Sequence, residues 1–199
     1  KKIYVKYGIW MILIGMMILM TCLSENFLST KNILNLVRQV SFISIIGFGS
    51  AFILICGGLD LSPGAVVAVT SVVSASFGRG EHPTALAILI GLCVGLAAGT
   101  INGIFVTKLK VPPFIATLGM MTSAKGIAML YTDGNSVNGL TDSYRIWGAG
   151  KLLGIPIPII IMLVLAVIMY ILLEHTPYGR HVVAVGDNEQ AAKISGIKT

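Results

Sequence analysis

Apolar residues fall into six runs, and short segments with most of the polar and charged residues separate them. The runs cover residues 8–23, 40–57, 64–77, 84–106, 114–131 and 157–173. A helix needs about 20 apolar residues to cross the hydrocarbon core of a bilayer, and all runs but the third approach that length. The third run is interpreted either as half of a discontinuous helix or as a span completed by the preceding loop. The pattern predicts an all-α fold, a polytopic transmembrane helical bundle of about six spans.

The composition agrees with a chain that lies in lipid. Of 199 residues, 55% are hydrophobic and 11% charged, and the mean hydropathy is +0.90. A soluble domain carries about 25% charged residues, so this chain has too little polar surface for a water-soluble body of its size. The net charge of +6 comes from dispersed basic residues beside the apolar runs. Such residues set membrane orientation, so we expect a lipid bilayer and no nucleic acid as partner.

The distribution of Lys and Arg predicts the orientation of the chain. With the N-terminus in the cytoplasm, the loops assigned to the inside hold more Lys and Arg residues than the loops assigned to the outside. This orientation places residues 174–199 in the cytoplasm. The basic start could pass for the n-region of a signal peptide, but no small-residue cleavage site follows, so the first run is interpreted as a span.

Residues 57–64 (GGLDLSPG) interrupt the apolar pattern between the second and third runs. Three glycines, a proline and an acid predict a broken helix here, and irregular backbone at membrane depth lies against protein or a water-filled cavity. We take Gly57, Gly58, Asp60 and Ser62 as candidate translocation-pathway residues, because an intramembrane acid is a functional candidate. The favoured alternative for Asp60 is that it caps the helix starting near Ser62.

The fourth run repeats glycine every four residues, at Gly91, Gly95, Gly99 and Gly103. Positions four apart share one helix face, so the glycines predict a groove for close helix–helix packing. Asn102, near the inner end of this run, is interpreted as a packing or capping amide.

Two polar segments complete the organisation. Gly and Pro residues disfavour regular structure throughout the external loop 132–156, which is either a solvated connection or a docking surface for an external partner. In the cytoplasmic tail we expect a short helix with Asn188 as its N-cap and Gly196 at its end. Such a helix suits docking into a groove of another protein.

No catalytic or metal-binding set stands out, so we do not expect an enzyme. The three histidines lie apart in loops, and the three cysteines are interpreted as small apolar residues within the runs. The chain has no phosphate-binding loop of the GxxxxGK[ST] type. We therefore expect no cofactor here, and any ATP that powers transport would bind to another subunit.

Three segments, in order, resemble the simple-sugar permeases of bacterial ATP-binding-cassette (ABC) importers, which act on ribose, xylose, galactose, arabinose and autoinducer-2. They are residues 57–64 (GGLDLSPG), 112–119 (PPFIATLG) with Gly126 after a basic residue, and 176–180 (TPYGR) with 184–197 (AVGDNEQAAKISGI). Branched-chain amino-acid and nucleoside permeases are relatives of this family. The chain departs from the usual pattern at Pro63, Lys125 and Asp187.

The resemblance implies an inner-membrane permease subunit that imports a monosaccharide such as ribose by alternating access. Within the cytoplasmic segment 174–199, it implies ATPase-coupling residues, which are Gly186, Asn188, Glu189, Ala191, Ala192, Ser195 and Gly196. It adds Phe114 and Thr117 to the candidate pathway. The implied partners are a cytoplasmic ABC ATPase, an extracytoplasmic sugar-binding protein and a second permease copy, identical or paralogous. Family members continue past the coupling segment, so residues 1–199 are expected to be the N-terminal part of one permease domain.

The alternative function is an ion-coupled secondary transporter of a small polar solute. Such a transporter needs intramembrane ionisable groups, and only Asp60 and Lys125 qualify. It would also leave the cytoplasmic tail without a role.

Overall fold

Helices dominate the fold. The structure is a computed structural model that describes residues 2–80 and 82–198. Its elements are α1 (Lys2–Leu23), α2 (Thr30–Ile55), α3 (Pro63–Phe77), α4 (Thr84–Thr107), α5 (Pro113–Thr132), α6 (Asp142–Ala149), β1 (Lys151–Leu152), β2 (Ile155–Pro156), α7 (Ile157–His175), α8 (Pro177–Asp187) and α9 (Glu189–Ile194). The predicted all-α class is confirmed, since the strands form only one short hairpin.

Each of the six predicted runs forms a helix, but the helices differ in length. Helices α2, α4, α5 and α7 are long and apolar enough to cross a membrane, whereas α3 and the apolar part of α1 are shorter. The 15 residues of α3 rise about 22 Å, less than the roughly 30 Å of a hydrocarbon core. Helix α3 is therefore too short to cross such a core by itself.

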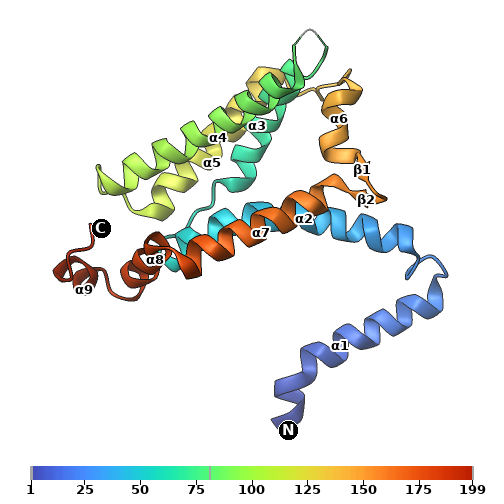
Figure 1. Cartoon of the computed structure of the whole chain (residues 1–199), viewed down its shortest axis with the longest axis horizontal. Coiled ribbons are helices and arrows are strands. Elements are labelled where there is room, and N and C mark those ends of the chain that lie inside the picture. The colour runs from blue at the N-terminus through green and yellow to red at the C-terminus, as the bar shows by residue number, and fades with distance from the viewer. Residues whose placement is uncertain (1, 81, 199) are drawn as a thin grey trace.

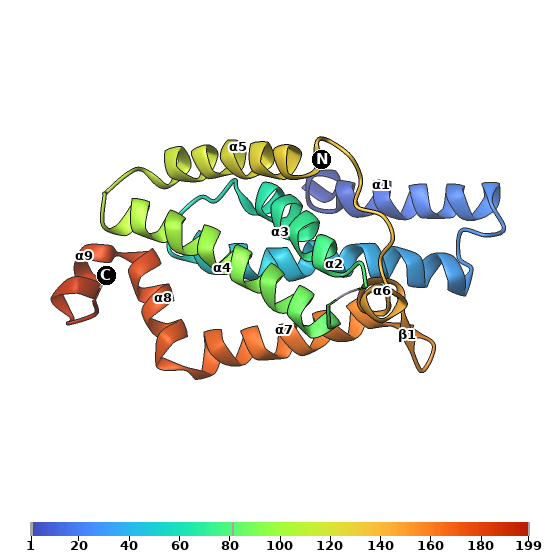
Figure 2. The ribbon, with the colours of Figure 1, turned by 90° about the horizontal axis from the view of Figure 1, so that it is seen from above.

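The helices form two groups that lie in separate layers (Figure 1). In one group α3 packs against α4 and α5, and in the other α2 packs against α7. Figure 1 shows α2 and α7 running side by side below the first group, with α1 extending away from both groups. Seen from above in Figure 2, α4 crosses over α2. Among the described residues, no helix of one group packs extensively against a helix of the other.

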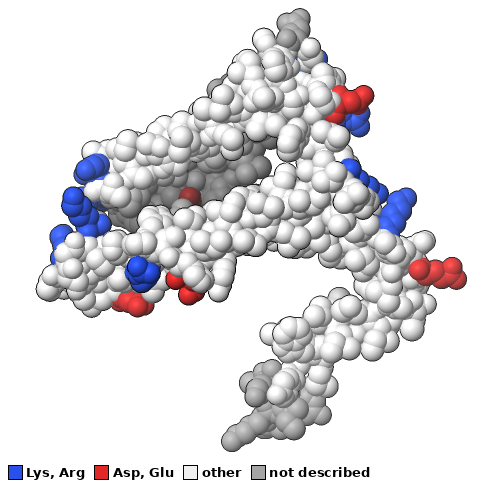
Figure 3. All heavy atoms as spheres, in the orientation of Figure 1, with Lys and Arg blue, Asp and Glu red and all other residues white. Residues whose placement is uncertain are grey.

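Small side chains make the contact within the first group. Its core consists of Val69, Ala124 and Ala128, and the partly buried Ala65, Ala68 and Val94 pack against it. In lipid, helices gain little from burying large apolar groups, so close packing of small residues holds them together. Most large apolar side chains are exposed accordingly. Figure 3 shows charged side chains mainly at the two ends of the layers, with an almost uncharged stretch between them.

The expectation that 132–156 lacks regular structure throughout is wrong for its second half. Helix α6 begins after Thr141, and Asp142 in its first turn is favourable to the helix dipole. β1 and β2 then form an antiparallel hairpin in which Lys151 is paired with Pro156 and Leu152 with Ile155. Leu153 (φ +52°) and Gly154 (φ +85°) form its two-residue turn, which requires positive φ at both positions. The prediction overlooked that glycine can serve a hairpin turn.

Candidate functional site

The irregular segment between α2 and α3 begins with a glycine that ends α2. Gly57 has a φ of +79°. Its N–H donates to the carbonyl of Leu54 (3.0 Å), and the N–H of Gly58 donates to that of Ile53 (2.9 Å). This pair of bonds is the Schellman motif, which favours glycine at the left-handed position. Gly57 and Gly58 therefore belong to the C-cap of α2.

Asp60 lies two residues before the N-cap position of α3. Its Oδ1 accepts hydrogen bonds from the backbone N–H of Ser62 (2.8 Å) and from the Ser62 hydroxyl (2.7 Å). This is an Asx turn, and the carboxylate is favourable near the positive end of the helix dipole. The N-cap position itself is occupied by Ser62, which is buried.

Side chains of α4 and α5 hold the second half of the segment. The Nδ2 of Asn102 donates to the Oγ of Ser62 (3.0 Å), and Asn102 is only 7% exposed. The hydroxyl of Thr117, also buried, lies 3.3 Å from the carbonyl oxygen of Leu59, and its shorter bond goes to the carbonyl of Pro113 (2.8 Å). Residues 59–62 are thus attached to α4 and α5, whereas Gly57 and Gly58 are attached to α2.

The structure gathers three of the six candidate pathway residues, Asp60, Ser62 and Thr117, into one polar cluster. Ser62 bonds both Asp60 and Asn102, and Thr117 contacts the same segment. Phe114 is half exposed and forms no part of this hydrogen-bonded cluster. The Oδ1 of Asn102 is buried without a hydrogen-bond partner. Among the described residues, no three His, Cys, Asp or Glu side chains lie close enough to hold a metal ion.

The glycine stripe of α4 lies against α3 along half of its length. A Cβ on Gly91 would lie 3.1 Å from the Cβ of Ser74, and one on Gly95 would lie 3.6 Å from the Cγ2 of Thr70. Gly99 and Gly103 have no described atom within 4 Å in that direction. The half of the stripe with Gly91 and Gly95 therefore packs within this chain, and the half with Gly99 and Gly103 is open here.

The expected short helix of the tail is α9, and both of its predicted end signals are confirmed. The side chain of Asn188 accepts a hydrogen bond from the N–H of Ala191 (3.0 Å) as the N-cap. Gly196, with a φ of +86°, follows the last turn in a second Schellman motif. Of the candidate coupling residues in this helix, Ala192 is buried, whereas Glu189 and Ala191 are exposed.

Helix α8 was not predicted, although Thr176-Pro177 signals a helix start. The side chain of Thr176 accepts from the N–H of Gly179 (3.2 Å) as the N-cap, and proline follows at the first helical position. Gly186 lies at the far end of α8, where a Cβ would overlap the carbonyl oxygen of Ile55. This candidate coupling residue therefore contacts the end of α2.

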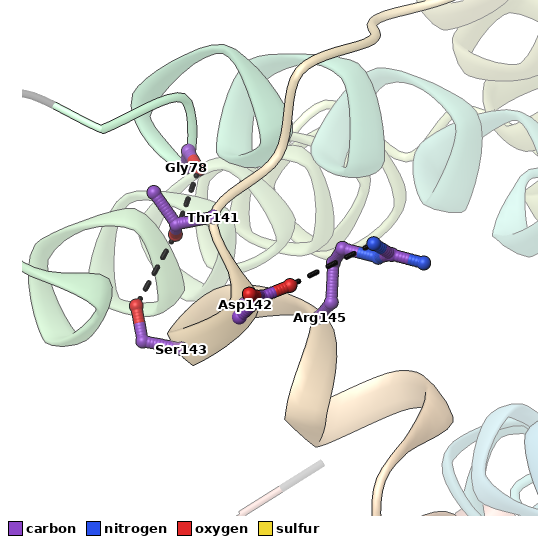
Figure 4. Close-up of polar contacts among 5 residues, drawn as sticks. All are labelled: Gly78, Thr141, Asp142, Ser143 and Arg145. Atoms are coloured by element: carbon purple, nitrogen blue, oxygen red, sulfur yellow. Dashed lines mark hydrogen bonds and ion pairs between the residues drawn. The ribbon is translucent and has the colours of Figure 1, made fainter.

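At the opposite end of the molecule, α6 is fastened to α3 (Figure 4). The backbone N–H and hydroxyl of Thr141 both donate to the carbonyl of Gly78 (3.0 and 3.1 Å). The hydroxyls of Tyr144 and Ser74 are 2.8 Å apart, and a Cβ on Gly78 would meet the Tyr144 ring at 2.8 Å. Asp142 and Arg145 form an exposed ion pair at 3.7 Å. Surface pairs of this kind add little stability, so Thr141 and Tyr144 fix the position of α6.

Comparison with known proteins identifies relatives along almost the whole chain. The family model described as branched-chain amino acid transport system / permease component matches residues 32–199. The ribose import permease protein RbsC of Bacillus subtilis (strain 168) is 44% identical over 195 residues, which are 97% of this chain and 61% of that protein. RbsC of Haemophilus influenzae is 41% identical over 93% of this chain and 58% of that protein.

A third relative carries a different sugar in its name. The D-allose transport system permease protein AlsC of Escherichia coli (strain K12) is 37% identical over 96% of this chain and 60% of that protein. The chain thus spans about three-fifths of the length of these curated relatives. No solved structure matches the chain significantly.

Proposed function

The chain belongs to the family of the branched-chain amino acid transport system permease components, and we propose that it acts in the permease subunit of an ABC importer for a monosaccharide such as ribose. The observation that carries this proposal is the identity of 44% and 41% with two ribose import permeases. The relatives named for sugars favour a sugar over a branched-chain amino acid as the substrate.

The proposed subunit spans the bacterial inner membrane several times with its N-terminus in the cytoplasm. This orientation puts α8 and α9 on the cytoplasmic side and the loop with α6 outside. A separate ATPase would bind ATP and contact α9 through exposed residues such as Glu189. A sugar-binding protein would dock outside, and a second permease copy would complete the pathway.

The two helix groups suggest how alternating access would work in such a subunit. Groups that pack tightly inside and loosely against each other can move as bodies. ATP-driven closure of the ATPase would displace the cytoplasmic segment and change the relation of the groups. The polar cluster at Asp60, Ser62 and Asn102 lies where the chain passes from one group to the other.

Uptake by the complete transporter in proteoliposomes tests the proposed function. The permease, its ATPase and its binding protein are reconstituted with ATP on the cytoplasmic side, and accumulation of labelled ribose is measured against allose and leucine. We expect ATP-dependent uptake of ribose that persists when an ionophore collapses the proton and sodium gradients. Loss of uptake with the ionophore would support the secondary transporter, and uptake of leucine alone would overturn the sugar assignment.

A further inference from the structure

Helix α8 bridges the cytoplasmic ends of α7 and α2. At its start, Thr176 donates to the carbonyl of Leu172 and caps α8, so a sharp corner joins α7 to α8. A Cβ on Gly179 would overlap the carbonyl oxygen of Leu173, so the corner requires a residue without a side chain at this position. The direction in which α8 leaves α7 is therefore fixed by local backbone contacts.

Three contacts then hold α8 against the last turn of α2. The rings of Tyr178 and Phe52 are stacked with centroids 6.1 Å apart. The Sγ of Cys56 lies 3.8 Å from the carbonyl oxygen of Val182. At Gly186 the two backbones meet, because a Cβ there would overlap the carbonyl oxygen of Ile55 and lie 3.4 Å from the Cα of Cys56.

The hydrogen bonds of the irregular segment divide at a single peptide. Gly57 and Gly58 donate back into α2. Leu59 and Ser62 are held from the other side by Thr117 and Asn102. The bond between Gly58 and Leu59 is thus where the chain passes from the α2–α7 group to the α3–α4–α5 group.

We propose that Gly186 is a positioning residue, which holds α8 against α2 so that α8 moves together with the α2–α7 group. A displacement of the cytoplasmic segment is then transmitted through α2 to the peptide between Gly58 and Leu59. The proposal rests on the proposed function, in which closure of the ATPase causes that displacement. Backbone-to-backbone contact at Gly186 transmits movement better than flexible side chains, because packed interfaces of this kind do not deform continuously. Gly186 therefore acts inside this chain, through α2, in addition to any contact of α9 with an ATPase.

Two substitutions that each add one carbon to α8 distinguish the positioning role of Gly186 from the effect of a larger side chain elsewhere on the helix. Gly186→Ala introduces a Cβ into the backbone of Ile55, so α8 must move away from α2. Val183→Leu adds one carbon to the same helix at a side chain that is 41% exposed, and it is the matched control. Both variants are prepared in the complete transporter, and equal assembly with the ATPase is checked first.

The first readout does not depend on transport. Cysteines replace Phe52 and Tyr178 in a background without the native cysteines, and a short bifunctional methanethiosulfonate, which forms reducible disulfide crosslinks, is applied in membranes. We expect efficient crosslinking in the parent and with Val183→Leu, and a clear loss with Gly186→Ala. Equal crosslinking in all three proteins would show that Gly186 does not hold α8 against α2, whether or not the protein transports sugar.

The second readout is the number of sugar molecules taken up per ATP hydrolysed. We expect Gly186→Ala to keep hydrolysing ATP while this ratio falls about tenfold, within the range of 5–150-fold typical of coupling between sites. Crosslinking positions 52 and 178 in the parent should leave uptake intact, because the two helices move together. An unchanged ratio in Gly186→Ala, or loss of uptake on crosslinking that reduction reverses, refutes the proposal. Absence of ATP-driven uptake in the parent would instead contradict the proposed function.

Discussion

Ser62 is the residue on which the polar cluster depends most, since its hydroxyl donates to Asp60 and accepts from Asn102. Replacing Ser62 with alanine leaves the buried Asn102 amide without its partner, and a buried unpaired polar group costs about 1–3 kcal/mol. We expect Ser62→Ala to lower the midpoint of thermal unfolding in detergent by about 5 °C, from a shift of roughly 2–4 °C per kcal/mol in chains of this size.

Ser71→Ala is the matched control on the same helix. The Ser71 hydroxyl is exposed, and its hydrogen bond goes to the carbonyl of Ala68 one turn earlier. We expect a change of less than about 1 °C there, within the scatter of surface substitutions. Equal midpoints for both variants would contradict a structural role for the bonds of Ser62.

What the sequence could predict of this cluster was limited to local chemistry. The position of Asp60 beside a helix start could be predicted from the local sequence, because Asp60 is only two residues from Ser62. The bond between Asn102 and Ser62 joins residues 40 positions apart, and only the packing of α4 on α3 brings them together. The sequence shows Asn102 only as an amide within an apolar run. This pattern predicted a packing or capping role, but it did not identify Ser62 as the hydrogen-bond partner.

At the scale of elements, the glycine stripe of α4 has two halves with different surroundings. Gly91→Leu would push a side chain into Ser74, whose Cβ is 3.1 Å from the position of an added Cβ. We expect this variant to reduce the yield of monodisperse protein several-fold in size-exclusion chromatography, because overpacking costs about 1–3 kcal/mol.

Gly99→Leu is the informative comparison for Gly91→Leu. No described atom lies within 4 Å of an added Cβ at Gly99, so this chain offers nothing for the leucine to displace. We expect normal yield, and loss of assembly with a second permease copy would locate that copy on the half of the stripe that contains Gly99. Normal yield for Gly91→Leu would refute close packing between α3 and α4.

Helix α6 offers a prediction about the end of the molecule opposite α8 and α9. Tyr144→Ala removes the ring that covers Gly78 and the hydroxyl that contacts Ser74. We expect the amide of Thr141, which bonds the carbonyl of Gly78 at 3.0 Å, to exchange its hydrogen at least about tenfold faster, since local opening governs exchange. Arg145→Ala breaks only the exposed pair with Asp142 and should leave the exchange unchanged. Equal exchange rates in the two variants would show that Tyr144 does not anchor α6.

The elements were predictable where hydrophobicity alone defines them. Each apolar run became a helix because lipid requires backbone hydrogen bonds to be satisfied within the segment. The short polar helices depend on capping and tertiary contact instead. α9 was predicted from Asn188 and Gly196, whereas α8 and α6 were missed. For α6, the glycines and prolines of residues 132–156 were interpreted as evidence against regular structure.

At the scale of the whole molecule, the arrangement of the two groups could not be predicted from the pattern. The runs specify which segments lie in the membrane, but not that α3 packs with α4 and α5 while α2 packs with α7. Within the first group, the small residues around Val69 and Ala124 permit close approach of the helices. The same partition makes the peptide after Gly58 the joint between the groups.

The native cysteines provide a test of how the whole chain is placed in the membrane. Cys22 lies at the end of α1, Cys56 at the end of α2, and Cys93 about 14 Å from the start of α4, at a rise of 1.5 Å per residue. All three thiols are exposed on the chain, so depth in the membrane decides which of them meets water. With the N-terminus in the cytoplasm, Cys22 belongs to the outer face and Cys56 to the inner face.

Variants that keep one native cysteine each are labelled with a membrane-impermeant maleimide, in intact cells and in inverted vesicles. We expect Cys22 to react from the outside, Cys56 from the inside, and Cys93 slowly from either side, because a membrane-impermeant reagent does not enter the middle of the candidate span Thr84–Thr107. Reaction of Cys22 and Cys56 from the same side would show that α2 does not cross the membrane. Reversed sides would keep the helical groups but place α8 and α9 outside, where no ATPase could reach them, and the importer proposal would fall with that result.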